Sequence, residues 1–491
     1  MSTECSSDKP IEPPSAIFPE MTMSKLAGIA LGELQSLGDL YDFKSMATLF
    51  FIGVVSITPT LPSLPLVKFI ASAADTEDDD LETVSSTYRL ENLKSWNKSS
   101  DCCSWDGITC DRFTGHVIGL NLGSSGLVGS IHSNSSLFLL HHLQKLNLAC
   151  NDFSGSKISS NFGEFMKLTH LNLFIQFRWP TEANSLVNLS SSLISLRLDR
   201  CSLQGEFPNY IFQLPLLQKL WLSGNEDLFG RLPKSNWSSP LRSLDLSSTL
   251  FSGMLYYTIG NLISLNELDL SDCQFIGSLP TSLWNLTGIT FLNLGSNNFS
   301  GQVSGLLSNL GQLNHLDLSA NNFSREFPDV FGNLSKLIVG HAGANNFTGY
   351  LPPSAFNHIQ LSELDLSDSQ FEGHIPQVSH LLYLTDRIPS LGSLNLSNNK
   401  LSGPVSNSIF EHANLTNLDL SSNNLSGIVK SEKFSKLKNL IVVDLSHNDL
   451  LTLKSDMVDF SLPKLRGFMF SSCNLTEFPI FLRNSKSLIF H

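Results

Sequence analysis

The chain has 491 residues, of which 41% are hydrophobic and only 15% charged, and its formal net charge is -13. A negative chain without a stripe of Lys and Arg is a poor partner for phosphate backbones, so these totals argue against nucleic-acid binding. Ser, Asn, Gly and Leu take the place of the missing charged residues.

The first 74 residues differ from everything downstream. Residues 1–45 are polar and contain proline, and we expect them to form a disordered leader. Residues 46–74 form an apolar run that ends near the small residues Ala71-Ser72-Ala73, as a secretory signal peptide does. Three prolines and a lysine within the run argue against a membrane-spanning helix. An uncleaved membrane anchor and a mis-assembled first exon remain the alternatives.

Residues 93–111 gather three cysteines, Cys102, Cys103 and Cys110, beside Trp96 and Trp105. Three thiols so close together could hold zinc. They lack a C-x-x-C pair and a neighbouring His, however, so a zinc site is the weaker alternative. The sequence therefore predicts no metal.

Farther along, the sequence repeats itself every 24 or 25 residues, except for a 50-residue step from Asn151 to Cys201, which holds two units, and a 30-residue step from Ser369 to Asn399, with a six-residue excess around 378–389. LQKLNLACNDFSG at 143–155 follows the frame L-x-x-L-x-L-x-x-N-x-L-x-G, and the frame recurs downstream. Its Asn position holds Asn151, Cys201, Asn225, Thr249, Cys273, Asn297, Asn321, Asn345, Ser369, Asn399, Asn423, Asn448 and Cys473. The paired leucines alternate with polar residues, as in a short strand with one buried face. Stacked copies predict a parallel sheet with leucines inside.

The Asn position has a structural explanation. An Asn that turns inward after the strand can hydrogen-bond backbone groups leaving the ladder, each of which would cost about 1–3 kcal/mol if buried unpaired. Small weak donors replace Asn in the same slot, and we expect them to be unreactive structural residues. They are Cys201, Thr249, Cys273, Ser369 and Cys473. The unit at 337–347 departs from the frame, because Gly340 and Ala342 replace core leucines, and it predicts an underpacked strand.

The second half of each unit carries Gly and often Pro, as in GEFP, GRLP, GSLP, GYLP and GHIP. This pattern resembles the plant-specific leucine-rich repeat of receptor kinases, receptor-like proteins and polygalacturonase-inhibiting proteins. The resemblance implies an α/β repeat solenoid: a superhelix with a parallel β-sheet on its concave face, a second short sheet and an N-terminal helical, disulfide-bonded cap. It places the cap at 80–116 and about 15 repeats at 117–491.

The resemblance also implies the pairing of the cap cysteines. In that family the second cysteine of the pair bonds the one that follows, which implies a disulfide between Cys103 and Cys110. The family's partner for Cys102 stands at the start of the cap helix, where this sequence has no cysteine.

Asn-x-Ser/Thr triplets are abundant and predict a glycoprotein of the secretory pathway. Asn- and Leu-rich repeats also form such triplets by chance, which is the alternative. The acceptors are Asn97, Asn134, Asn188, Asn236, Asn285, Asn298, Asn322, Asn333, Asn346, Asn395, Asn414, Asn424 and Asn474.

The strand positions that face outward from the leucine core are candidates for ligand binding. Most carry the Leu-Asp-Leu-Ser filler of the family, and the departures from it are large aromatic or basic side chains typical of binding anchors. Scattered exposed residues of this kind also occur without function. The candidates are Arg197, Arg200, Trp221, Phe291, His315 and His341.

No catalytic signature appears: there is no G-x-S-x-G elbow, P-loop, H-E-x-x-H or dinucleotide fingerprint, so we expect neither an enzyme nor a cofactor. The resemblance to the disease-resistance class of receptor-like proteins implies an extracellular defence-signalling domain. It would bind a peptide or protein ligand and act through a co-receptor kinase at the cell membrane. Alternatives are an apoplastic inhibitor of microbial cell-wall hydrolases, resembling the polygalacturonase-inhibiting proteins, and a receptor-kinase ectodomain. Because a repeat begins at Leu488 and the chain stops at His491, we expect a front portion whose membrane segment is missing.

Overall fold

The computed structural model describes residues 95–96, 100–129, 131–153, 157–174, 181–235, 237, 239–377, 390–454, 460–475, 479–483, 485 and 488. All of them belong to one unit of the chain, 58–491. The predicted leader, the signal-like segment and the start of the cap lie outside the described residues, as do a six-residue excess around 378–389 and the acceptors Asn97 and Asn236.

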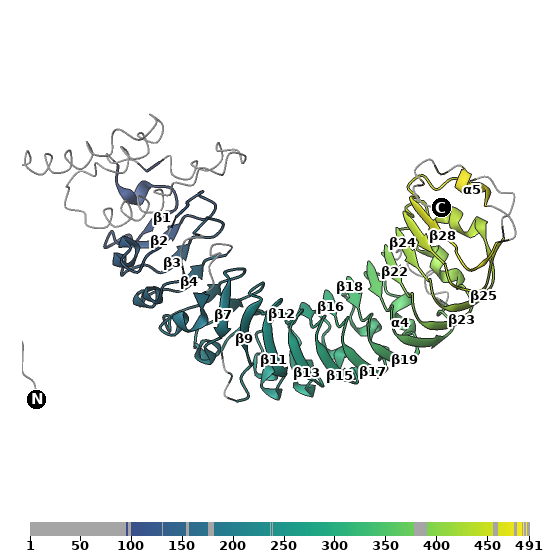
Figure 1. Cartoon of the computed structure of the whole chain (residues 1–491), viewed down its shortest axis with the longest axis horizontal. Helices are drawn as coiled ribbons and strands as arrows, with labels where there is room; N and C mark the ends of the chain where they lie inside the picture. The colour runs from purple at the N-terminus through teal and green to yellow at the C-terminus, as the bar shows by residue number, and fades with distance from the viewer. Residues whose placement is uncertain are drawn as a thin grey trace, which may run out of the picture. The chain divides into compact units, whose positions relative to one another are not determined.

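The repeats stack into a sixteen-stranded sheet that lines the inner side of the arc of repeats (Figure 1). Strand β1 (Ile108–Cys110) pairs antiparallel with β2 (Val117–Asn121), and the later pairs are parallel. The other strands are β3 (Lys145–Asn147), β4 (His170–Asn172), β6 (Ser195–Arg197), β8 (Lys219–Trp221), β10 (Ser243–Asp245), β12 (Glu267–Asp269), β14 (Phe291–Asn293), β16 (His315–Asp317), β18 (Val339–His341), β20 (Glu363–Asp365), β22 (Ser393–Asn395), β24 (Asn417–Asp419), β26 (Val442–Asp444) and β28 (Gly467–Met469). The stacked parallel sheet predicted from the period is confirmed, and so is the leucine-rich-repeat solenoid that the resemblance implied.

A second sheet of thirteen strands follows the outer side of the same repeats (Figure 1). Its strands are β5 (Thr181–Glu182), β7 (Leu203–Glu206), β9 (Asp227–Gly230), β11 (Leu250–Met254), β13 (Gln274–Gly277), β15 (Asn298–Gly301), β17 (Asn322–Glu326), β19 (Asn346–Tyr350), β21 (Gln370–Gly373), β23 (Lys400–Pro404), β25 (Asn424–Lys430), β27 (Leu450–Lys454) and β29 (Asn474–Leu475). The repeated Gly lies in these strands, as Gly205 does in β7 and Gly253 in β11. Its backbone is left-handed there, with φ +83° and +95°, a conformation that glycine adopts without strain.

Short helices lead the chain back into most strands of the first sheet. Most are single 3-10 turns, since a repeat of this length leaves few residues for the return. They are η2 (Cys102–Ser104), η3 (Ser136–Leu139), η4 (Ser160–Glu164), η5 (Ala183–Leu186), η6 (Asn209–Gln213), η7 (Tyr257–Asn261), η8 (Thr281–Asn285), η9 (Gly305–Asn309), η10 (Phe331–Asn333), η12 (Asn407–Glu411) and η13 (Ser431–Lys436), with α-helical turns α4 (Pro353–Phe356) and α5 (Ile480–Arg483).

The hydrophobic core runs the length of the stack. The paired leucines are buried, as at Leu244 and Leu246, which are 1% and 0% exposed. Phenylalanines two positions after the Asn slot form a second spine, in which the rings of neighbouring repeats lie nearly parallel. Each repeat therefore buries its apolar surface chiefly against its two neighbours.

The Asn of the repeat frame makes the hydrogen bonds that the sequence predicts, as Asn225 shows. Its Nδ2 donates to the carbonyls of Leu198 and Leu222 at 2.9 and 2.6 Å, and its Oδ1 accepts from the amides of Cys201 and Leu203. The substitutes donate to backbone carbonyls as well: Cys201, Thr249, Ser369, Cys273 and Cys473 each make such a bond. Burial raises the pKa of the Cys273 thiol to about 11, which keeps it protonated and unreactive.

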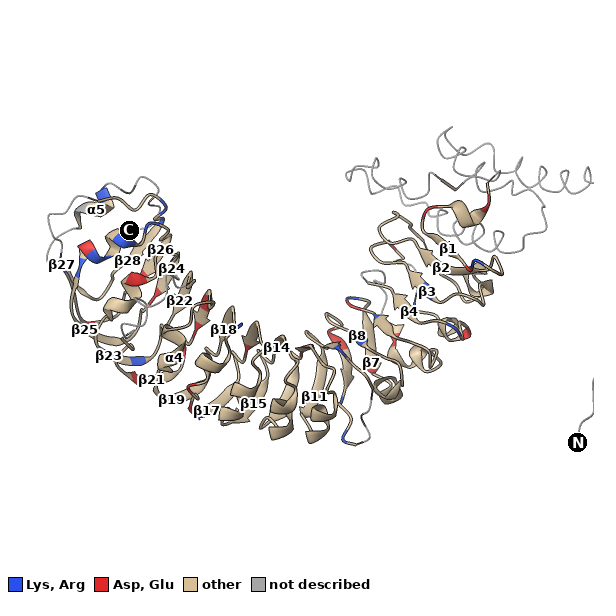
Figure 2. Cartoon of the chain, turned by 180° about the vertical axis from the view of Figure 1, so that it is seen from behind, with Lys and Arg blue, Asp and Glu red and all other residues tan. Residues whose placement is uncertain are grey.

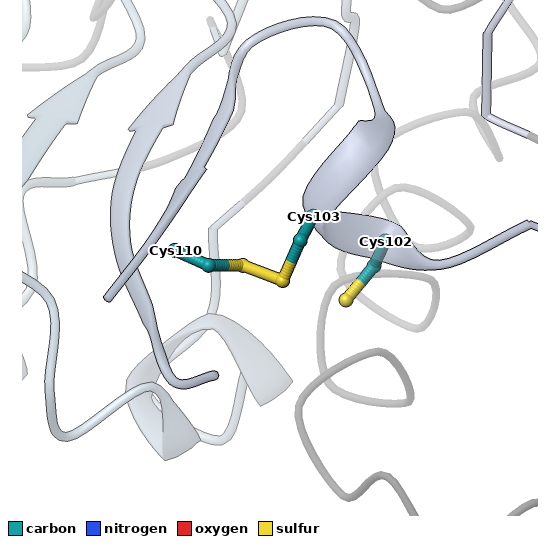
Figure 3. A group of neighbouring side chains, drawn as sticks. All are labelled: Cys102, Cys103 and Cys110. Carbon is teal, nitrogen blue, oxygen red and sulfur yellow. A yellow bond between two sulfur atoms is a disulfide. The ribbon is translucent and has the colours of Figure 1, made fainter. Parts of the chain in front are cut away.

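The cap contains the disulfide between Cys103 and Cys110 that the family resemblance implied (Figure 3). The thiol of Cys102 is buried beside this bond, within 4.8 Å of the two bonded sulfurs, and is not itself disulfide-bonded. Because the disulfide uses two of the three sulfurs, it rules out the three-thiolate zinc site. Trp96 stacks on Trp105 with ring centroids 4.9 Å apart.

The strand containing Gly340 corrects one expectation, because it is not underpacked. A Cβ at Gly340 would lie 3.2 Å from the Phe331 ring and 3.5 Å from Leu337, so the space vacated by leucine is already occupied. Phe331 is itself buried, with 1% of its surface exposed. The glycine accommodates a larger side chain from the same repeat.

Gly340→Leu should therefore lower the free energy of unfolding by about 1–3 kcal/mol through overpacking. If the site were empty, the same substitution would fill it and raise the free energy of unfolding. The measurement is a denaturant titration beside Gly305→Leu, since no atom lies within 4 Å of the Cβ position at Gly305. A gain in stability for Gly340→Leu would show that the strand is underpacked, as the sequence had predicted.

Candidate functional site

The strand register brings the candidate residues together on one face of the first sheet. This outward face points away from the leucine core and lies on the inner, concave side of the arc (Figure 1). In the column between the paired leucines, Arg197 lies beside Trp221, Trp221 beside Asp245, and Asp245 beside Asp269. Neighbouring strands are about 4.8 Å apart, so these side chains contact one another across strands. Residues separated by some 24 positions in the sequence thus form one surface.

A hollow of about 520 Å³ opens on this face across β6, β8, β10, β12 and β14. Its walls combine aromatic rings with charged groups: four carboxylates face two guanidinium groups. The lining residues are Phe174, Arg197, Asp199, Arg200, Trp221, Ser223, Ser243, Leu244, Asp245, Glu267, Asp269 and Phe291.

Arg197 is held rigidly in the wall of this hollow. Its guanidinium carbon lies 4.5 Å from the ring centroid of Phe174 and 4.7 Å from that of Trp221, both within cation–π range. Its Nε donates to Oδ2 of Asp199 at 2.6 Å. The rings and the carboxylate fix Arg197 before any ligand arrives, which lowers the entropy cost of binding.

Asp199 is the most deeply buried carboxylate of the hollow, with 4% of its surface exposed. Burial raises its pKa, and the hydrogen bond and charge of Arg197 oppose that rise. The second oxygen, Oδ1, has no hydrogen-bond partner among the described residues. Asp199 therefore contributes a buried carboxylate, already paired with Arg197, to the wall of the hollow.

The other acidic residues lie across from Arg197. Trp221 Nε1 donates to Ser243 Oγ at 2.7 Å, and Ser243 Oγ donates to Glu267 Oε2 at 2.8 Å. Asp245 and Asp269 each accept from the serine two residues later through one oxygen. Burial raises the pKa of Asp269, and the like charge of Asp245 adds to the rise.

Aromatic stacking continues the surface beyond the hollow. Phe291 stacks on His315 with centroids 4.5 Å apart, and His315 meets His341 edge-on at 6.2 Å. His341 Nδ1 lies 3.7 Å from Asp317 Oδ2, and its Nε2 lies 3.2 Å from Glu363 Oε1 without the alignment of a hydrogen bond. Asp317 chiefly raises the pKa of His341, whereas burial lowers that of His315.

The His341 pair predicts a pH-dependent stability. Because the pKa of His341 is raised in the folded chain, its pairing with Asp317 stabilises the fold. This contribution to stability is complete below the unfolded-state pKa of about 6.5 and is lost as pH rises through the folded-state pKa. His341→Gln should cost about 0.5–1 kcal/mol at pH ~5.5 and less at pH ~8.5. Thermal unfolding of both proteins at the two pH values measures it, with exposed His141→Gln as control. A cost independent of pH would contradict the pairing.

The structure brings four of the six predicted residues together. Arg197, Arg200, Trp221 and Phe291 line the hollow. His315 and His341 continue from Phe291 along the face, outside the hollow. Sequence reasoning missed Phe174, Asp199, Ser243 and Glu267, and it set Asp245 and Asp269 aside as filler. The sequence did carry one signal for the Arg197–Asp199 pair. In the common Leu-Asp-Leu-Ser pattern, Arg197 takes the place of Asp and Asp199 takes the place of Ser.

The predicted glycosylation acceptors mostly lie away from this face. Among the described acceptors all are exposed except Asn395, which is half-buried in β22 on the inner sheet. Its Nδ2 donates to Asp365 Oδ2 at 3.3 Å. Asn298, Asn322 and Asn346 begin three successive strands of the second sheet, so glycans there would leave the inner face open.

Lys and Arg form no continuous stripe along the described part of the stack (Figure 2). Among the described residues, no helix has the length and apolar character needed to cross a bilayer.

Two families match segments of the chain. Residues 83–111 match the family described as "Leucine rich repeat N-terminal domain", and residues 264–286, 312–334, 390–411 and 414–434 match "Leucine Rich Repeat". Both agree with the cap and the repeat frame.

Curated plant proteins match parts of the chain. Receptor-like protein 6 of Arabidopsis thaliana is 36% identical over 234 residues, with 36% of this chain and 24% of that protein covered. Receptor-like protein Cf-9 of Solanum pimpinellifolium is 36% identical over 210 residues, with 42% of this chain and 24% of that protein covered. The chain spans about a quarter of the length of these relatives.

Solved structures agree on the fold. The ectodomain of the Arabidopsis receptor kinase HAESA, bound to an extended IDA peptide hormone, is 25% identical with a TM-score of 0.57, and the match covers 81% of this chain and 77% of that one. A TDR receptor structure shares the fold at 23% identity and a TM-score of 0.51, over 75% of this chain and 74% of that one. The chain therefore contains a leucine-rich-repeat N-terminal cap followed by leucine-rich repeats, and the segments that match are similar to plant receptor-like proteins.

Proposed function

We propose that this chain is the extracellular recognition domain of a defence receptor, which binds a peptide or protein ligand on the outward face of its first sheet. The observation that carries the proposal is the hollow across β6–β14, where Arg197 is fixed between two rings on an otherwise polar face. Rigid Arg and aromatic side chains are the groups that dominate binding energy at protein interfaces.

A related ectodomain supports a peptide as the ligand and a kinase as the partner. The HAESA ectodomain, with a TM-score of 0.56, was solved with the peptide hormone IDA and the co-receptor SERK1. By analogy, the present chain would hold its ligand on the inner face and act through a partner receptor kinase at the extracellular face of the cell membrane. The defence role rests on the resemblance to the disease-resistance class of receptor-like proteins.

Selection of random peptides displayed on phage tests where binding occurs. The full chain, secreted from plant cells, is the target, and each selected peptide is titrated against wild type and the double variant Trp221→Ala/Phe291→Ala. We expect the double variant to lose about 2–4 kcal/mol of binding free energy, the size of a hot-spot loss.

The matched control is Tyr257→Ala/Tyr350→Ala, which removes two exposed aromatic rings from other faces of the repeats. This variant should bind the selected peptides as wild type does. If the peptides bind the Trp221/Phe291 variant unchanged, the outward face of the first sheet is not the recognition surface and the proposal fails.

A further inference from the structure

The charges of the hollow are unbalanced in a way that the proposed function does not explain. Arg197 is already paired with Asp199, at 2.6 Å. Asp245, Glu267 and Asp269 form no ion pair with a Lys or Arg among the described residues, although all three line the same hollow. Lys219 Nζ lies 5.5 Å from the Trp221 ring centroid and is not a lining residue, and Arg200, which does line the hollow, forms no ion pair with these three carboxylates among the described residues.

The carboxylates also repel one another. The charge of Asp245 raises the pKa of both Asp199 and Asp269, after the larger effect of burial on each. One oxygen of Asp245 and one of Asp269 accept from serines, and a hydrogen bond from Asn293 also lowers the pKa of Asp269, so the second oxygen of Asp245 is the one left for a ligand.

Apolar walls stand beside these carboxylates. Trp221 and Phe291 both line the hollow and are half-buried, so each presents part of its ring. A side chain with an aliphatic stem and a positive end matches this combination, because its stem can cover a ring while its charge reaches the carboxylates. A lone inorganic cation would leave the rings uncovered.

We propose that the hollow binds a Lys or Arg side chain of the ligand, with the stem against Trp221 and Phe291 and the cation on Asp245 and Asp269. This inference rests on the proposed function and specifies the chemistry of the ligand. A salt-dependent affinity follows, since part of the binding energy is electrostatic and exposed to screening.

The repeat column supplies conservative variants for the test. Asn already occupies the column position at Asn293 and Asn395, where its Oδ1 accepts from the backbone amide two residues later, as Asp does in other repeats. Asp245→Asn/Asp269→Asn should therefore remove two charges and keep the fold. The matched control is Asp419→Asn/Asp444→Asn, in the same column on β24 and β26 but outside the hollow.

The probes are the phage-selected peptides and, for each, a synthetic copy in which Gln replaces every Lys and Arg. We expect the selected peptides to be enriched in Lys or Arg over the starting library. The Gln copy should bind wild type at least about tenfold more weakly, and the Asp245/Asp269 variant should bind the original peptide at least about tenfold more weakly, a change of ~1.4 kcal/mol. The Asp419/Asp444 variant should bind as wild type does.

Three results would overturn the inference: no enrichment of basic residues, equal binding of the Gln copies, or a preference for Asp and Glu, which would assign the hollow to an anion held by Arg200. In each case, the proposed function would still be supported if the peptides bind the Trp221/Phe291 variant more weakly than wild type. If the peptides bind the Trp221/Phe291 and the Asp245/Asp269 variants as tightly as wild type, both proposals are contradicted.

Discussion

Asn225→Ala should lower the free energy of unfolding by about 3–5 kcal/mol, the effect of leaving several buried backbone groups unpaired. The side chain is fully buried and joins two carbonyls and two amides from adjacent repeats. Alanine removes all four hydrogen bonds and cannot be hydrated without opening the stack. Denaturant titration of the secreted chain measures the loss, and hydrogen exchange at the amides of Cys201 and Leu203 locates it.

Asn225→Thr is the graded control for this position. Thr249 shows that a hydroxyl in the slot donates to the carbonyl three residues earlier, at 2.7 Å. The Thr variant should therefore recover part of the stability that Ala loses. If Asn225→Ala unfolds within about 0.5 kcal/mol of wild type, the Asn slot does not stabilise the repeats as described.

Phe323→Ala should cost about 3–5 kcal/mol, the usual range for removing a buried ring. Phe323 is fully buried, and its ring lies 6.2 Å from those of Phe299 and Phe347, nearly parallel to both. The cavity would interrupt the spine between two repeats, so the loss should be shared by their interface. Calorimetry or denaturant titration measures it.

Phe113→Ala provides the comparison, because Phe113 is 97% exposed. That substitution should change stability by less than about 0.5 kcal/mol. Equal effects for the buried and the exposed phenylalanine would contradict a continuous aromatic spine.

The repeat frame made much of the fold predictable. Leucines at alternate positions, spaced by a constant period, permit a single stacked arrangement, and the Asn slot explained how the ladder ends. The fully buried Asn225 and the parallel partner strands agree with that reasoning. The second sheet followed from the family resemblance rather than from the period.

The hollow was only partly predictable, because its contacts depend on distances between repeats. Arg197 and Trp221 stood out as departures from the filler, but the partner Asp199 lies in a slot that serine normally fills. Glu267 contributes through Ser243, a residue that looks ordinary in the sequence. The packing at Gly340 was missed for a similar reason, since the volume of Phe331 replaces a leucine nine residues away from it.

Hydrogen exchange of the full chain, with and without a selected peptide, tests the central claim most directly. The account predicts that the peptide slows exchange at strand amides of β6, β8, β10, β12 and β14, which surround the hollow. Slowed exchange confined to the second sheet, or to the cap, would show that the ligand binds elsewhere and would contradict the recognition surface described above.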